Sequence, residues 1–140
     1  MDTAEKQNAA CEHEMASGRT FPWHELYVPD LQKGIEFYTN ALGFGHEKMS
    51  MGEMGDYNML SMNGKTIAGM MSTNELPMPG VPPHWAVYLG VDNVDDRVAK
   101  VLEHGGTVVV PAMDIETVGR MALIADPQGA HIWLFTPSME

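Results

Sequence analysis

The fold of this chain is decided by two short stretches with the same pattern, Val28-Pro29-Asp30-Leu31 and Val91-Asp92-Asn93-Val94. In each, an apolar run ends at Asp or Asn, which are favoured helix N-cap residues. An amphipathic pattern follows, and each pattern ends in glycine. The copies are offset by about 63 residues, and self-similarity at this scale predicts two equal modules within one chain.

Each module is expected to contain a strand, a helix and three further strands. The two-residue turn Asn63-Gly64 predicts a tight hairpin in the first module, and Asp126-Pro127-Gln128-Gly129 predicts a turn at the equivalent place in the second. In the first module the strands are expected at 23–28, 45–51, 56–62 and 66–72, with a helix over 31–42. In the second they are expected at 84–91, 107–110, 119–125 and 130–136, with a helix over 94–104.

The expected organisation is a single domain over residues 21–137. Residues 1–20 are polar and acidic without periodicity, which predicts a disordered leader. The first βαβββ module covers 21–72, a connector with four prolines covers 73–83, and the second βαβββ module covers 84–137. The fold class is therefore α+β, with two βαβββ modules in tandem that form a curved mixed sheet around a cavity.

Composition excludes several classes of function. The formal net charge is −11, which opposes binding to nucleic acid or to an anionic membrane. No apolar run has the length of a membrane span, and no signal peptide is visible, so a cytoplasmic protein is expected. The single cysteine, Cys11, cannot form an internal disulfide. The thirteen methionines suit both irregular core gaps and adaptable pockets.

The order of these motifs resembles the vicinal oxygen chelate superfamily, which includes glyoxalase I, extradiol dioxygenases, fosfomycin-resistance enzymes and bleomycin-resistance proteins. The matching pieces of the first half are Val28-Pro29-Asp30, Ile35-Glu36-Phe37-Tyr38 and Leu42-Gly43-Phe44. Those of the second half are Val91-Asp92-Asn93-Val94, Gly105-Gly106 and Asp126-Pro127-Gln128-Gly129-Ala130. Pro82-Pro83-His84-Trp85 and Gly119-Arg120-Met121-Ala122 resemble a glyoxalase-like branch. The resemblance covers about residues 21–136 and implies a small-molecule ligand and a homodimer.

The resemblance also implies where a divalent metal would bind. Metal-dependent members carry His, Glu or Gln at four equivalent positions, on the first and last strands of each module. Counting from the turns places these positions at Trp23, Ala68, Ala86 and Trp133. Neither indole nor methyl offers a lone pair to a metal, so we expect no metal cofactor. As an alternative, a displaced set of Glu25, His84 and His131 has residue types suited to zinc, nickel or iron.

The side chains expected to face the cavity follow from strand alternation. They are Trp23, Glu25, Tyr27, His84, Tyr88, His131 and Trp133. Glu25 is the candidate catalytic residue, because a carboxylate on an aromatic strand face needs a partner, water or a cationic ligand. The aromatic residues equally suit a packed core, His84 a cavity rim, and His131 a hydrogen-bonded strand position.

Three functions remain open from the sequence. The first is binding of a small apolar or cationic molecule in an aromatic cavity without the usual metal, which is similar to the bleomycin-resistance mode. The second is a metal-dependent glyoxalase-type lyase or isomerase, or a dioxygenase, with the displaced ligand set. The third is a metal-free enzyme in which Glu25 works with His84 or His131 as acid and base.

Overall fold

The structure is a computed structural model of the 140-residue chain that describes residues 21–115 and 118–138. The expected leader, residues 1–20, lies outside the described residues. The chain divides into two compact units, one of which is Trp23–Ala86 and the other of which contains Val87–Glu140. Among the described residues, no helix is long and apolar enough to cross a membrane.

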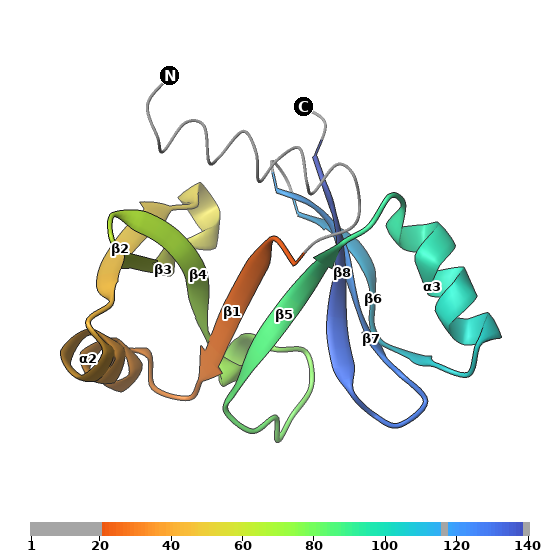
Figure 1. Cartoon of the computed structure of the whole chain (residues 1–140), viewed down its shortest axis with the longest axis horizontal. Coiled ribbons are helices and arrows are strands. Elements are labelled where there is room, and N and C mark those ends of the chain that lie inside the picture. The colour runs from red at the N-terminus through yellow and green to blue at the C-terminus, as the bar shows by residue number, and fades with distance from the viewer. Residues whose placement is uncertain (1–20, 116–117, 139–140) are drawn as a thin grey trace. The chain divides into compact units, whose positions relative to one another are not determined.

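The first unit is a four-stranded mixed sheet with one long helix. Its elements are β1 (Trp23–Val28), α2 (Leu31–Leu42), β2 (Gly45–Ser50), β3 (Asp56–Met62) and β4 (Lys65–Ser72), with short 3₁₀ turns η1 (Gly52–Met54) and η2 (Thr73–Glu75). The strand order is β2-β3-β4-β1 (Figure 1). β1 pairs with β4 in parallel, and β2–β3 and β3–β4 are antiparallel. A parallel pair needs a crossover, and α2 with β2 and β3 supplies it.

Local chemistry sets the ends of these elements. The Asp30 carboxylate accepts a hydrogen bond from the backbone N–H of Lys33 at 3.0 Å and so caps α2. Gly43 ends the helix in the left-handed conformation, with φ +79°. Asn63 and Gly64 both have positive φ, +54° and +79°, as the predicted two-residue hairpin requires.

The core of the first unit lies between its sheet and α2. Its most buried members come from β1, β3 and β4, and the apolar side of α2 packs against them. These core residues are Leu26, Leu60, Ala68 and Met70, with Val28, Leu31, Ile35, Tyr38 and Phe44 around them. One face of this sheet is therefore occupied by the helix, and functional side chains must use the other.

The second unit repeats the same order. Its elements are β5 (His84–Gly90), α3 (Val94–Glu103), β6 (Thr107–Ile115), β7 (Gly119–Ala125) and β8 (His131–Pro137), in the order β5-β8-β7-β6. β5 and β8 are parallel and the other pairs antiparallel. β5 crosses the boundary between the units, because residues up to Ala86 group with the first.

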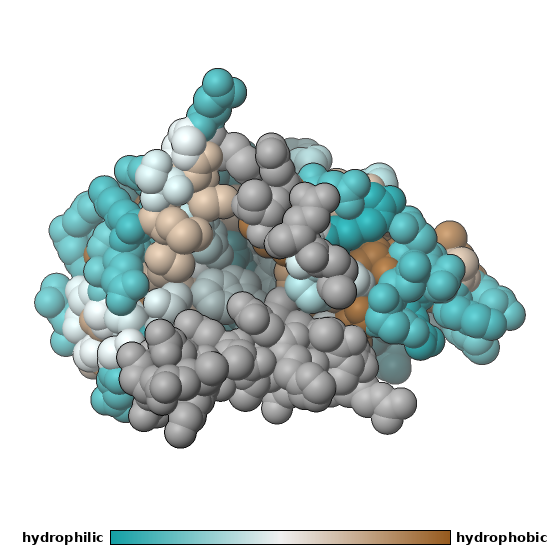
Figure 2. Space-filling model, turned by 90° about the horizontal axis from the view of Figure 1, so that it is seen from above, coloured by the Kyte–Doolittle hydropathy of each residue, from teal (hydrophilic) through white to brown (hydrophobic). Residues whose placement is uncertain are grey.

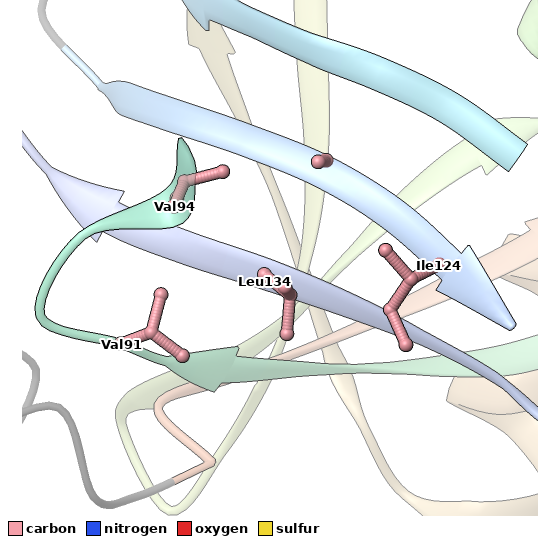
Figure 3. Packing of buried hydrophobic residues seen from close by; sticks show 5 residues of the cluster. Val91, Val94, Ile124 and Leu134 are labelled. Carbon is pink, nitrogen blue, oxygen red and sulfur yellow. The ribbon is translucent and has the colours of Figure 1, made fainter. Parts of the chain in front are cut away.

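The second core has the same plan as the first. Val91, which directly follows β5, and Val94, the first residue of α3, cluster with Ile124 of β7 and Leu134 of β8 (Figure 3). Further residues of α3 pack against this cluster. The carboxylate of Asp126 accepts hydrogen bonds from the backbone N–H groups of Gln128 and Ala130, and so stabilises the turn predicted here.

The predicted α+β class with two βαβββ modules is confirmed. The helices and most strands agree with the expected ranges within one or two residues. β6 differs, because it extends to Ile115 through two irregularities in its pairing with β7. Such irregular stretches break the alternation of apolar and polar residues, which is the signal for a strand.

Figure 2 shows one side of the molecule coloured by hydropathy. The described residues on that side are largely hydrophilic, in keeping with the net charge of −11.

Candidate functional site

The most distinctive polar group of the first unit is the carboxylate of Glu25 on β1. The residue is 3% exposed and lies on the sheet face opposite the α2 core, because its neighbour Leu26 packs into that core. Two donors hold it: Trp23 Nε1 at 2.9 Å and the Tyr57 hydroxyl at 2.6 Å. The indole N–H also lies 3.2 Å from the Tyr57 oxygen, so the three side chains form a closed triangle. We call Trp23, Glu25 and Tyr57 the carboxylate cluster.

Both hydrogen bonds end on the same oxygen, Oε2 of Glu25. Within residues 21–115 and 118–138, no donor is placed on Oε1. The indole has one N–H and the phenol one O–H, and both protons are already directed at the carboxylate. When Glu25 is ionised, the cluster therefore presents an acceptor and has no spare donor.

Burial dominates the electrostatics of the cluster. Desolvation raises the pKa of Glu25 to about 7, although the hydrogen bonds from Tyr57 and Trp23 act in the opposite direction and the negative charge of Glu75 adds slightly to the rise. The same burial, together with the adjacent carboxylate, raises the pKa of the Tyr57 phenol far above its usual value. Tyr57 is therefore a stable hydrogen-bond donor, and Glu25 changes its ionisation near neutral pH.

A glycine provides the room for this triangle. Gly69 on β4 pairs with Glu25 of β1 on one side and with Met59 of β3 on the other. A Cβ at this position would collide with the Tyr57 hydroxyl and with Oε2 of Glu25. Gly69 therefore allows the phenol to pass over β4, on one face of the sheet, and reach the carboxylate on β1.

The prediction that Ala68 occupies one of the four metal positions is wrong by one residue. Ala68 is 2% exposed and packs in the core beneath α2. Leu60 pairs with Ala68 whereas Ser61 pairs with Thr66, so β4 contains an extra residue, Ile67, at this point. Such a bulge shifts the alternation by one, and the residue on the Glu25 face is Gly69.

The other predicted residues of the first unit lie beside the cluster on the sheet. Tyr27 is 2% exposed and stacks on the imidazole of His84, with ring centroids 5.1 Å apart and planes inclined by 20°. His84 Nδ1 lies 2.8 Å from the carbonyl oxygen of Pro82, which fixes the ring. Tyr27 also pairs with Met71 of β4. The face thus combines aromatic rings and methionines around one carboxylate.

The predicted residues of the second unit form an aromatic pair and one separate histidine. Tyr88 and Trp133 pair in register and stack with centroids 5.4 Å apart and planes inclined by 7°. Both are buried and lie on the face opposite the α3 core. His131 is exposed, and its Nδ1 lies 2.9 Å from the carbonyl oxygen of Gly129 in the neighbouring turn. The structure therefore brings together Tyr88 and Trp133, whereas His131 lies exposed at the first position of β8.

The donor set at the expected metal positions does not suit a metal. With the correction on β4, these positions hold Trp23, Gly69, Ala86 and Trp133, and none offers a lone pair. The Trp23 N–H is moreover engaged with Glu25. Among the described residues, no group of three or more His, Cys, Asp or Glu side chains is placed to hold a metal. The alternative set of Glu25, His84 and His131 spans both units and stays a prediction.

Sequence reasoning missed Tyr57 and Gly69. Both follow from strand pairing, which brings β1, β4 and β3 side by side and is not visible in any local pattern. A weak signal existed for Gly69, since glycine inside a strand often marks a close approach of another group. The hydroxyl of Tyr57 carried no signal before its partner was known.

Comparison with known proteins agrees with this architecture. The model of the glyoxalase/bleomycin resistance protein/dioxygenase superfamily matches residues 20–134. The chain belongs to this superfamily. Its members share a fold on which several chemistries are built, so the particular function has to be argued from the site.

Individual relatives extend this result. The chain is 37% identical over 119 residues to "Putative glyoxylase CFP32" of Mycobacterium bovis. The match covers 85% of this chain and 44% of that protein. It is 32% identical over 120 residues to the anthracycline biosynthesis protein DnrV of Streptomyces peucetius, covering 77% and 43%. The chain thus spans less than half the length of these relatives. Methylmalonyl-CoA epimerase from Mycobacterium tuberculosis has the same fold, with a TM-score of 0.55 at 19% identity over 83% of this chain and 86% of that one.

Proposed function

We propose that this protein binds a small apolar or cationic molecule on the sheet face that carries the carboxylate cluster, without the usual metal of the superfamily. The observation that carries the proposal is the buried Glu25 carboxylate, whose two hydrogen bonds both end on Oε2. A buried carboxylate with an acceptor atom left over is costly unless something else occupies that atom. A ligand would supply that contact.

The surroundings of Glu25 support an apolar or flat ligand. Trp23 and Tyr57 are half-buried, so they connect the carboxylate to the surface of the sheet. The Tyr27–His84 stack provides a flat contact, and Met59 of β3 and Met71 of β4, which pair with Gly69 and Tyr27, provide adaptable ones. The name of the relative DnrV, an anthracycline biosynthesis protein, supports a ligand of this general shape.

A second candidate function is metal-free proton transfer by Glu25. It is favoured by one observation, namely that burial raises the pKa of Glu25 to about 7. A carboxyl group with a pKa near the working pH is an effective general acid or base. On this hypothesis Glu25 takes a proton from a bound substrate through Oε1, while Tyr57 and Trp23 stabilise the ionised form through Oε2.

Further assignments concern metal and assembly. A homodimer in the cytoplasm is part of the proposal, as is the absence of a resident metal. The metal-dependent alternative, a glyoxalase-type lyase or dioxygenase with Glu25, His84 and His131 as ligands, makes the opposite prediction. Elemental analysis of protein purified without chelator separates the two, because a stoichiometric divalent ion would overturn the metal-free proposal. Sedimentation at several concentrations tests the dimer.

Ligand binding is tested with a flat aromatic molecule that also carries a cationic amino group. An anthracycline is a suitable probe because its own fluorescence changes on binding. We expect saturable binding by the wild type and a loss of roughly tenfold or more in affinity for Glu25→Gln. A hydrogen bond to a charged group contributes a factor of about that size to the affinity. Glu36→Gln, an exposed residue on α2, removes the same charge away from the site and serves as the control. Equal affinity in all three proteins would contradict a role for Glu25.

A further inference from the structure

The carboxylate cluster has an unusual distribution of donors and acceptors. Trp23 and Tyr57 each have one polar hydrogen, and both point to Oε2 of Glu25. The Tyr57 oxygen in turn accepts from the indole at 3.2 Å. With Glu25 ionised, the polar atom that the cluster leaves for a ligand is therefore an acceptor, Oε1.

Two features keep this distribution fixed. Gly69 leaves room for the Tyr57 hydroxyl above β4, so the phenol lies against Oε2 of Glu25. A Cβ at position 69 would collide with that hydroxyl. Trp23 lies two residues before Glu25 on the same strand face, so its indole reaches the same oxygen. The donors of the cluster are thus built into strand pairing, and they do not reorient toward a ligand at low cost.

From this geometry we infer that the ligand places a hydrogen-bond donor, an N–H or O–H group, on Oε1 of Glu25, and that ligands presenting a carboxylate there are rejected. The inference rests on the proposed binding function and specifies its ligand class. A donor completes the hydrogen bonding of a buried acceptor, whereas an anion would face the carboxylate without an intervening proton. Selection of this kind is stronger than selection by apolar contacts, because the mismatch leaves a buried polar group unpaired.

Benzamidine and benzoate test this assignment as a matched pair. Both are a flat ring bearing a planar three-atom group, but benzamidine carries only donors and benzoate only acceptors. Binding is followed by NMR through the Trp23 indole N–H signal, at about pH 8.5 and high salt, where the carboxyl with its pKa of about 7 is ionised and bulk charge is screened. We expect benzamidine to shift this signal with an affinity at least about tenfold above that of benzoate.

The variant Glu25→Gln sharpens the test. Its amide oxygen can keep both hydrogen bonds at the position of Oε2, which places the NH₂ group at the position of Oε1 and turns the acceptor into a donor. The preference between the two probes should then reverse, whereas the control Glu36→Gln keeps that of the wild type. Because the two probes are compared on one protein, loss of folding in the variant would leave the wild-type comparison intact.

The possible results are distinguishable from failure of the proposed function. Equal binding of both probes at the Trp23 signal, or a preference for benzoate, overturns the inference while leaving small-molecule binding at this site in place. A preference for benzamidine that survives in Glu25→Gln assigns the selectivity to another group and also overturns it. If benzamidine up to its solubility limit does not shift the Trp23 signal, the inference is wrong even where the larger anthracycline binds.

Discussion

Replacing Glu25 by Gln should remove a pH dependence from the stability of the fold. Burial raises the pKa of Glu25 in the folded protein to about 7 from an ordinary value of 4.5, so the folded state holds its proton more tightly than the unfolded chain does. The stability that this proton contributes is fully present below about pH 4.5 and is lost as the pH rises through about 7. The difference between the two pKa values corresponds to about 3 kcal/mol.

The matching measurement is chemical denaturation of wild type and Glu25→Gln at intervals between about pH 4.5 and 8.5. The amide is neutral throughout, so the free energy of unfolding of the variant minus that of the wild type should increase with pH by about 3 kcal/mol. For a domain of this size that corresponds to a relative change in Tm of roughly 10 °C. Taking the difference cancels the contribution of the histidines and of the other carboxylates.

Glu36→Gln again provides the control, because Glu36 is exposed on α2. Its difference from the wild type, measured over the same pH range, is the baseline against which the change in Glu25→Gln is judged. Parallel curves for wild type and Glu25→Gln would refute the reasoning, since they would mean that Glu25 titrates alike in the folded and unfolded states. If the free energy of unfolding of Glu25→Gln minus that of the wild type decreased as the pH rises, the sign would be opposite. Ionised Glu25 would then stabilise the folded state.

Three further perturbations address the same architecture. Tyr57→Phe removes a donor from the ionised carboxylate and should raise the pKa of Glu25 above about 7, which an NMR titration of its carboxyl carbon would detect. Gly69→Ala should displace the Tyr57 hydroxyl and cost about 1–3 kcal/mol of stability, measured by urea denaturation; an unchanged midpoint would show that the phenol moves freely. Trp133→Ala removes a buried ring stacked on Tyr88 and should cost about 3–5 kcal/mol, and a loss below about 1 kcal/mol would mean that the stack is dispensable.

The fold could be predicted from the sequence because its signals are local and occur twice. Asp30 and Asn93 cap helices in the structure as their positions before apolar periodic runs indicated. Asn63-Gly64 and Asp126 form the predicted turns, since positive φ and side-chain acceptors are properties of single residues. Each of these features is decided within a few residues of chain.

The site could be predicted only in part, because its geometry depends on pairing between distant strands. Alternation along β1 correctly placed Trp23 and Glu25 on one face, and their side chains are hydrogen-bonded to each other. Tyr57 lies 32 residues from Glu25 in sequence, and no periodicity links them. The bulge at Ile67 then moved the facing position from Ala68 to Gly69, and a bulge of this kind has no reliable signature in a single sequence.

The energetic cost of Glu25 is itself an argument for a binding role. Above neutral pH the folded state holds an ionised carboxylate that is 3% exposed, at a cost of about 3 kcal/mol relative to an ordinary glutamate. A neutral side chain of similar size would avoid this cost, and most domains have only about 5–15 kcal/mol of stability in total. Strained or desolvated groups of this kind concentrate where function requires them. A donor on Oε1 would stabilise the ionised form of Glu25 and so offset part of this destabilisation on binding. The buried carboxylate that destabilises the free protein would therefore also make it selective for its ligand.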